Sequence, residues 1–203
     1  MIARSMQRPA GTITRQAGLT AAVMAWLLLA AVAWHLLFRH AYYPSKTPRP
    51  EESRISVQTS NCYRVLLFAH PLCPCTRATL MELDESLARI PAKTSIKIVF
   101  ETAGLNPEEV SNSALVHFVK ERQRIEVQFD AQGRESRRFG ATVSGEVLAF
   151  DPAGRLRFRG GLTPGRGHQG DATGQAQFER IVSGSSTDFC CAPVYGCRLP
   201  IGQ

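Results

Sequence analysis

Hydrophobic residues are spaced differently in different parts of the chain. The first hydrophobic stretch is almost unbroken. Residues 18–38 are almost entirely apolar and carry no formal charge. About 20 such residues cross the hydrocarbon core of a bilayer, and the block has no polar face of the kind that a helix packed on a soluble core would show. We therefore predict a transmembrane signal-anchor helix over 18–38. Residues 31–33 resemble a signal-peptidase site, but the apolar run continues to Phe38, so we expect the helix to be retained.

The predicted anchor divides the chain into segments of different character. Arginines 4, 8 and 15 precede it, which favours a cytoplasmic N-terminus. Prolines and charges follow it and predict an extended tether. The expected organisation is a short cytoplasmic segment over 1–17, the anchor over 18–38, the tether over 39–53, a globular domain over 54–184 and a cysteine-containing tail over 185–203.

Beyond the tether, short apolar runs alternate with stretches of helical spacing. The predicted strands are 65–69, 95–100, 125–129, 146–150 and 156–158. The predicted helices are 76–89, 112–122 and 171–182, with a brief helix that ends near 139–140. Strands that alternate with helices favour parallel pairing, and a late hairpin around 151–154 adds an antiparallel edge. The sequence thus predicts an α/β fold in which a central mixed sheet has helices on both faces.

Composition and charge narrow the classes of function. The chain is 44% hydrophobic and 20% charged, as expected for a globular protein. The net charge of +7 comes from scattered arginines without a basic block or interleaved aromatic residues. A nucleic-acid partner is therefore not expected, and a solvated basic surface explains the charge.

Cys73-Pro74-Cys75 lies where an apolar strand gives way to a helix. The free N–H groups and the dipole at a helix N-terminus favour a thiolate, which is both a nucleophile and a metal ligand. Two inert core cysteines are the alternative, but Pro71 and Pro74 favour an exposed turn. The pair therefore indicates thiol–disulfide exchange or metal binding.

Three stretches of the chain together suggest a family. They are 65–75 with its strand and cysteine loop, 129–141 before the central strand, and 147–156 with the hairpin. The pattern resembles the thioredoxin-like superfamily, especially its membrane-tethered TlpA and peroxiredoxin-like branches. The resemblance implies a three-layer sandwich and protein thiols or disulfides as partners. It also implies that Cys73 is the exposed nucleophile, that Cys75 resolves the mixed disulfide, and that no organic cofactor is needed.

The chain departs from the family pattern at three positions. The usual motif is Cys-x-x-Cys, whereas here the spacing is Cys-x-Cys and Thr76 occupies the usual resolving position. The family places a cis-proline before the hairpin, and Gly145 stands there instead. Peroxide reduction is a further option, but His70 occupies the position of the peroxiredoxin threonine. His70 either tunes the thiolate or serves as a ligand.

Four other cysteines are Cys62, Cys190, Cys191 and Cys197. An even number of cysteines suits disulfides if the domain faces an oxidising compartment. A tail cysteine could exchange electrons with the Cys73–Cys75 pair, or a tail disulfide could pin the C-terminus to the domain through Cys62. Both interpretations stay open, the second being slightly favoured.

Metal binding is the alternative of a different class. Cys73, Cys75, His70 and tail cysteines could surround Cu(I) or Zn(II), because both ions accept soft thiolate ligands. Thioredoxin-like copper chaperones, however, usually space their cysteines Cys-x-x-x-Cys. The glycine-rich segment 160–171 could cradle an anion, but we interpret it as a loop with Asp171 as a helix N-cap. Arg166 or His168 would border the site only if this loop curls back.

Together these features predict a membrane-anchored thiol–disulfide oxidoreductase in the bacterial inner membrane. Its globular domain would lie on the periplasmic side and act on extracytoplasmic proteins through Cys73 and Cys75. The alternative is a thioredoxin-like carrier of copper or zinc that uses the same cysteines.

Overall fold

The computed structural model describes residues 10–45 and 55–200, with side chains from residue 17 onward. The chain falls into two compact units, Met1–His40 and Ala41–Gln203. The ends of the expected N-terminal segment and tail, 1–9 and 201–203, lie outside the described residues, as does most of the expected tether, 46–53.

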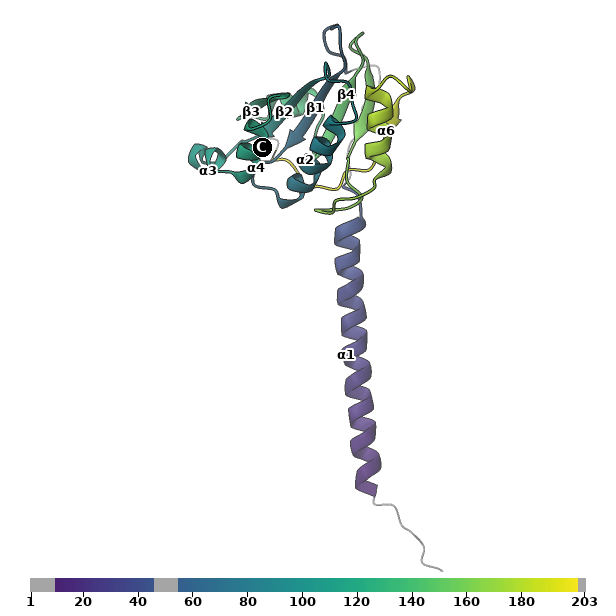
Figure 1. Cartoon of the computed structure of the whole chain (residues 1–203). Coiled ribbons are helices and arrows are strands. Elements are labelled where there is room, and N and C mark those ends of the chain that lie inside the picture. Colours follow the sequence, from purple (N-terminus) through teal and green to yellow (C-terminus); the bar gives the residue numbers. More distant parts are fainter. Residues whose placement is uncertain (1–9, 46–54, 201–203) are drawn as a thin grey trace, which may run out of the picture. The chain divides into compact units, whose positions relative to one another are not determined.

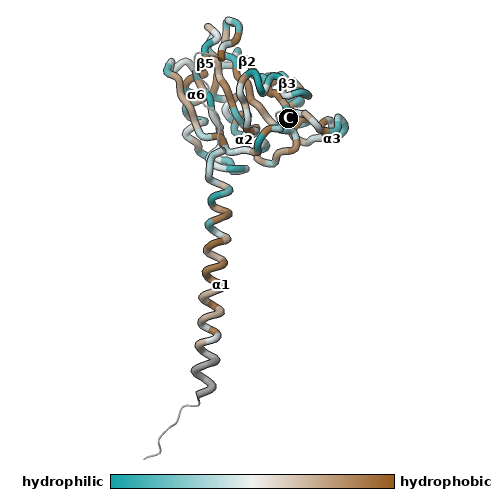
Figure 2. The backbone as a smooth tube through the Cα atoms, turned by 180° about the vertical axis from the view of Figure 1, so that it is seen from behind, coloured by the Kyte–Doolittle hydropathy of each residue, from teal (hydrophilic) through white to brown (hydrophobic). Residues whose placement is uncertain are grey.

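The described part of the first unit is helical and belongs to helix α1, Ala10–Tyr42, whose last two residues fall in the second unit. Its span Ala17–Tyr42 has a mean hydropathy of 2.1 over its most apolar window, and none of that window is buried. By length and composition this helix could cross a membrane, and Figure 2 shows the apolar stretch along its middle. The helix extends beyond the predicted 18–38 at both ends, and residues 39–42, expected to open the tether, are helical. No proline interrupts the helix before Pro44, which explains its later end.

The second unit is built on one six-stranded sheet (Figure 1). Its order is β3-β2-β1-β4-β5-β6. Strands β1, β2 and β3 are parallel, β4 runs antiparallel to both β1 and β5, and β6 pairs with β5 in parallel. The strands are β1 Arg64–Ala69, β2 Ser95–Glu101, β3 Ile125–Asp130, β4 Glu146–Phe150, β5 Leu156–Gly160 and β6 Cys190–Cys191. The predicted mixed sheet is confirmed, and β6 is an addition to it.

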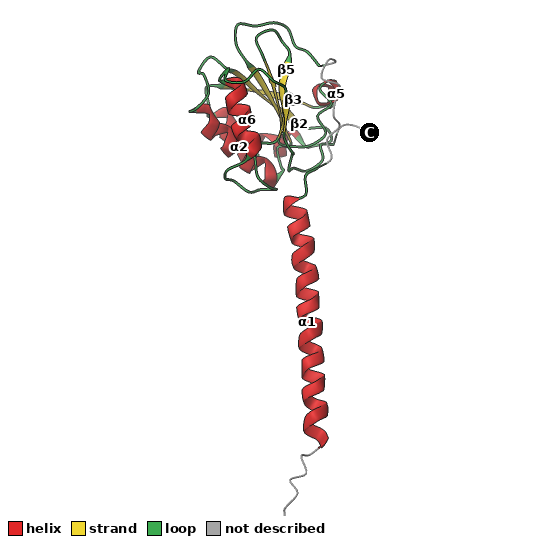
Figure 3. Cartoon of the chain, turned by 90° about the vertical axis from the view of Figure 1, so that its right-hand side faces the viewer, coloured by secondary structure: helices red, strands yellow, loops and turns green. Residues whose placement is uncertain are grey.

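Helices cover both faces of this sheet (Figure 3). They are α2 Pro74–Leu87, α3 Pro107–Ser111, α4 Ala114–Lys120, α5 Arg134–Arg138 and α6 Thr173–Val182. The larger core joins apolar residues of α2, α4 and α6 to one face, including Leu83, Val116 and Phe178. The smaller core lies on the other face, where Phe139 at the end of α5 packs near Phe68. Two buried layers therefore fix β1 at the centre of the domain.

Three helix boundaries differ from those predicted. Helix α2 begins two residues before the predicted Thr76, because Pro74 has the fixed φ that suits a first helical position. The predicted helix 112–122 is shorter and follows a separate turn, α3, because Ser113 caps α4 by accepting a hydrogen bond from Leu115 N–H. The N-cap of α6 is Ala172 without a side-chain hydrogen bond, so the prediction that Asp171 caps this helix is wrong.

The C-terminal segment is part of the folded unit. Val194 and Leu199 are buried, at 2% and 6% exposure. Arg198 forms an antiparallel bridge with Val143 in the loop that leads into β4. This packing brings the residues between Val194 and Leu199 to the end of the sheet at which α2 begins.

Candidate functional site

The site begins in the loop between β1 and α2. Cys73 is the N-cap of α2, with φ −83° and ψ 119°, and Cys75 lies in the first helical turn. The loop closes on itself because Cys73 N–H donates to His70 O at 3.1 Å and Thr76 N–H donates to Cys73 O at 3.1 Å. The first cysteine thus stands at the helix N-terminus that the sequence predicts.

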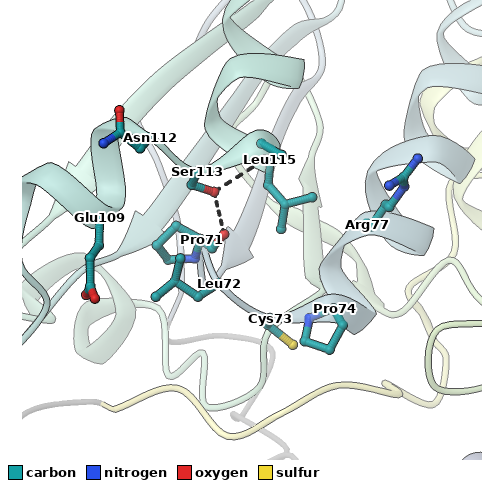
Figure 4. A pocket seen from close by; sticks show the side chains of 10 residues that line it. Pro71, Leu72, Cys73, Pro74, Arg77, Glu109, Asn112, Ser113 and Leu115 are labelled. Atoms are coloured by element: carbon teal, nitrogen blue, oxygen red, sulfur yellow. Dashed lines mark hydrogen bonds between the residues drawn. The ribbon is translucent and has the colours of Figure 1, made fainter.

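A third thiol joins the pair. The Sγ atoms of Cys73, Cys75 and Cys197 all lie within 4.8 Å of one another. Cys197 comes from the C-terminal segment, and the pale yellow ribbon of that segment passes close to Cys73 in Figure 4. Among the three cysteines of the tail, it is Cys197 that lies beside the Cys73–Cys75 pair.

The other cysteines lie elsewhere, and all six are free thiols. Cys190 and Cys191 form β6, which is three strands away from β1, a distance of about 14 Å at the usual strand spacing. Cys62 lies two residues before β1. A disulfide needs Cα atoms within about 7 Å, so this strand order does not favour Cys190 or Cys191 as the tail cysteine of the predicted link to Cys62.

The three thiols differ in their electrostatic environment. Burial would raise the pKa of Cys73, but hydrogen bonds from Cys197 and Thr76 outweigh it and lower that pKa. Burial, followed by the nearby Cys73, raises the pKa of Cys75, and Arg166 partly opposes this. Burial and the other two thiols raise the pKa of Cys197 to about 12. Cys73 is therefore the thiol most readily ionised, as its position at the helix N-terminus suggests.

Cys73 is only 3% exposed, so the expected exposed nucleophile is in fact covered. The C-terminal segment lies against it, with Cys197 Sγ within 4.8 Å of Cys73 Sγ, as the interpretation of a tail cysteine that exchanges electrons with the pair requires. An open pocket of about 570 Å³ nevertheless reaches Cys73 from the side of α3 and α4 (Figure 4). Leu72 and Leu115 line it, and Leu72 is 45% exposed. Ser113 Oγ shapes the pocket by donating to Pro71 O at 2.6 Å.

Hydrogen bonds hold the backbone around Cys197 against the loop before β4. Ser144 N–H donates to Cys197 O at 2.8 Å, and Leu199 N–H donates to Thr142 O at 2.9 Å. Gly196 O accepts from Ser45 Oγ at 2.8 Å and from Arg166 Nη1. Arg166 therefore lies next to the site, as expected if the glycine-rich loop curls back.

Gly196 allows the close approach of the two segments. A Cβ on this residue would lie 1.8 Å from Ser144 O, a backbone atom that has little freedom to move. Only glycine therefore permits this contact between the C-terminal segment and the loop.

Gly145 occupies the position at which the family resemblance calls for a cis-proline. No peptide bond in the described residues is cis, and Gly145 has φ +92°. Its N–H donates to Phe68 O at 2.8 Å, and a Cβ here would lie 2.8 Å from Thr79 Oγ1. The backbone conformation and the tight packing both require glycine.

Ser144 is a site residue that the sequence reasoning missed. Its Oγ accepts from His70 N–H at 2.9 Å and shares a 2.6 Å hydrogen bond with Thr76 Oγ1. Ser144 therefore links the cysteine loop, the start of α2 and the segment that carries Cys197. Its place beside Gly145 was the only signal in the sequence.

His70 does not join the thiols. Its Nδ1 accepts from Leu72 N–H at 3.3 Å, and burial lowers its pKa, which favours the neutral ring. The group of possible metal ligands found among the described residues contains the three thiols without His70. The structure therefore assigns this histidine a part in shaping the loop.

The sheet order, the β4–β5 hairpin and the dithiol at the start of α2 define a thioredoxin-like fold. No family model and no curated protein matches the chain. Among solved structures, a hypothetical protein from Sinorhizobium meliloti 1021 is similar, with a TM-score of 0.51 and 16% identity over 68% of this chain and 78% of that one.

Two further solved structures are more distant. An uncharacterized conserved protein from Geobacillus kaustophilus has a TM-score of 0.49 and 14% identity, over 78% of this chain and 92% of that one. A secreted Mycobacterium tuberculosis disulfide oxidoreductase homologous to E. coli DsbE has a TM-score of 0.44 and 16% identity, over 67% of this chain and 99% of that one. At such identities the likeness concerns the fold alone.

Proposed function

We propose that this protein is a membrane-anchored thiol–disulfide oxidoreductase that acts on extracytoplasmic proteins. The observation that carries the proposal is the Cys73 thiol at the N-terminus of α2, with a lowered pKa and two further thiols within 4.8 Å. A readily ionised thiol with a second thiol in reach is what disulfide exchange requires.

The exchange proceeds in two balanced steps. The Cys73 thiolate attacks one sulfur of a substrate disulfide, which forms a mixed disulfide and releases the first substrate thiolate. A second thiol within 4.8 Å, Cys75 or Cys197, then loses its proton and attacks Cys73 Sγ, which releases the second substrate thiolate. The substrate gains two electrons and the two protons lost by the protein thiols, and the protein keeps one disulfide. The reverse sequence oxidises a substrate dithiol.

Helix α1 supports the proposed location. Its large apolar side chains are exposed on all sides, among them Leu28 at 67% and Trp34 at 73%, as suits contact with lipid. The arginines before it favour a cytoplasmic N-terminus. The catalytic domain would then lie in the periplasm, where disulfides persist.

The test is a redox titration of the full chain in detergent against a glutathione series, with disulfides mapped by mass spectrometry. We expect a reversible disulfide that includes Cys73, and loss of all exchange in Cys73→Ser. Cys191→Ser is the matched control, because this exposed tail cysteine lies on β6 away from the site, and it should exchange like the parent. Normal exchange by Cys73→Ser would refute the proposal.

One observation favours a second candidate, a carrier of Cu(I) or Zn(II). Three thiols from two segments converge within 4.8 Å, which fits ions that prefer soft sulfur ligands. Cys73, Cys75 and Cys197 would hold the ion. The same preparation decides between the two candidates, because thiols that resist oxidation and take up one equivalent of Cu(I) or Zn(II) would favour the carrier.

A further inference from the structure

We propose that Cys197 is the resolving thiol of this site, so that Cys197 rather than Cys75 attacks Cys73 once a substrate is bound to it. The inference rests on the proposed exchange activity and deepens it. The redox-active disulfide would then join the loop before α2 to the C-terminal segment, rather than two cysteines of the same loop.

The position of Cys75 argues for another resolving residue. Cys73 is the extended N-cap of α2 and Cys75 lies in its first turn, so only Pro74 separates the two thiols in the sequence although their Sγ atoms lie within 4.8 Å. A bond between them would close a small, strained ring. Cys197 approaches from a separate segment, so a bond from Cys73 to Cys197 closes no such ring, and its Sγ is within 4.8 Å of each of the other two.

Cys197 is held in place rather than carried on a loose end. Val194 and Leu199 are buried on either side of it, and Ser144 N–H donates to Cys197 O at 2.8 Å. The carbonyl of the preceding Gly196 accepts from Ser45 and Arg166. A short span between two buried anchors presents the thiol to Cys73, and such positioning is what makes an intramolecular step fast.

Cys73 and Cys197 differ in their exposure to solvent, which suits them to different steps. Cys73 is 3% exposed whereas Cys197 is an exposed residue. A substrate therefore reaches Cys73 through the open pocket beside Leu72, and a disulfide between Cys73 and Cys197 leaves a sulfur at the surface for the next partner.

Burial and the neighbouring Cys73 thiol raise the pKa of Cys197. In a mixed disulfide between Cys73 and a substrate thiol, Cys73 carries no charge and opposes ionisation of Cys197 less, and the deprotonated Cys197 attacks Cys73 Sγ. A bond forms between Cys73 and Cys197, and the bond to the substrate breaks with its electron pair on the substrate sulfur. That sulfur takes up the proton that Cys197 released to solvent. A dithiol of a partner protein later reduces the exposed disulfide by the same exchange in two steps, and the partner keeps the disulfide that results.

The experiment mixes the reduced full chain, in detergent, with oxidised glutathione as the probe disulfide. Mass spectrometry follows the Cys73–glutathione adduct and the disulfides that replace it. The variants are Cys75→Ser and Cys197→Ser, with Cys197→Ala as a second form of the latter, and Cys191→Ser is the control. Circular dichroism checks that each variant keeps the parent fold.

We expect Cys75→Ser to clear the adduct at the parent rate and to form the Cys73–Cys197 disulfide. Cys197→Ser and Cys197→Ala should lose this clearance and accumulate the adduct. If Cys197→Ser clears the adduct as the parent does, the inference is overturned while the oxidoreductase stands, because Cys75 then resolves. If the parent forms neither an adduct at Cys73 nor any disulfide that includes Cys73, the proposed function itself fails.

Discussion

Gly196→Ala should unseat the C-terminal segment and uncover the Cys73 thiol. The new Cβ would lie 1.8 Å from Ser144 O and 2.9 Å from Ser144 C, both backbone atoms. The segment must therefore lift by more than 1 Å, roughly the difference from an ordinary contact of about 3.5 Å. A shift of that size breaks the hydrogen bonds made between the segment and its surroundings.

The size of the effect follows from the hydrogen bonds that hold the C-terminal segment against the domain. Four hydrogen bonds hold residues 196–199 of the segment in place: Ser144 N–H to Cys197 O, Leu199 N–H to Thr142 O, and those from Ser45 Oγ and Arg166 to Gly196 O. At a net ~0.5–1 kcal/mol each they stabilise the seated state by about 2–4 kcal/mol. Their loss raises the population of the unseated state by roughly 30-fold to 1000-fold.

The assay is the rate at which iodoacetamide alkylates Cys73, followed by mass spectrometry at constant pH. Cys73 is 3% exposed in the seated state, so its alkylation should accelerate in Gly196→Ala until the thiol is fully accessible. Gly18→Ala is the control, because a Cβ there meets no atom within 4 Å. An unchanged rate in Gly196→Ala would show that the segment does not cover the nucleophile.

Two further changes test the electrostatics of the domain. Against the effect of burial, hydrogen bonds from Cys197 and then from the backbone and side chain of Thr76 lower the pKa of Cys73. Thr76→Val removes only the side-chain bond, so it should raise that pKa slightly and move the midpoint of alkylation to higher pH, while Thr76→Ser should restore it; a midpoint that stays or falls contradicts this assignment. Arg159→Met should lower the free energy of unfolding in urea by about 3–5 kcal/mol, because Glu146, 0% exposed, loses its 2.7 Å partner. Arg155→Met, whose ion pair has a 67% exposed arginine side chain, should cost less than about 1 kcal/mol; equal losses in the two variants would argue against the buried pair.

The sequence predicted the sheet well because its strands carry their own signal. Continuous apolar runs such as 65–69 and 146–150 are typical of strands buried on both faces, and the structure places β1 and β4 at the centre. The dithiol at the start of a helix was also predictable, because Pro74 and the apolar strand before it mark the boundary locally.

The rest of the site depends on contacts between distant residues. Nothing local distinguishes Cys197 from Cys190 or Cys191; its position follows from the docking of its neighbours on the loop before β4. The role of Ser144 could not be predicted for the same reason, because its partners His70 and Thr76 are more than 65 residues away in the sequence. Strand β6 has only two residues, too few to show any periodicity.

That short strand also bears on the solubility of the domain. An open sheet ends in rows of unpaired N–H and C=O groups that can recruit a strand from another molecule. Here β6 covers part of the edge of β5 with two residues and is followed at once by Ala192 and Pro193. Proline has no N–H to donate to an incoming strand. The segment that brings a thiol to the site thus also blunts one edge of the sheet and protects the domain against edge-to-edge aggregation.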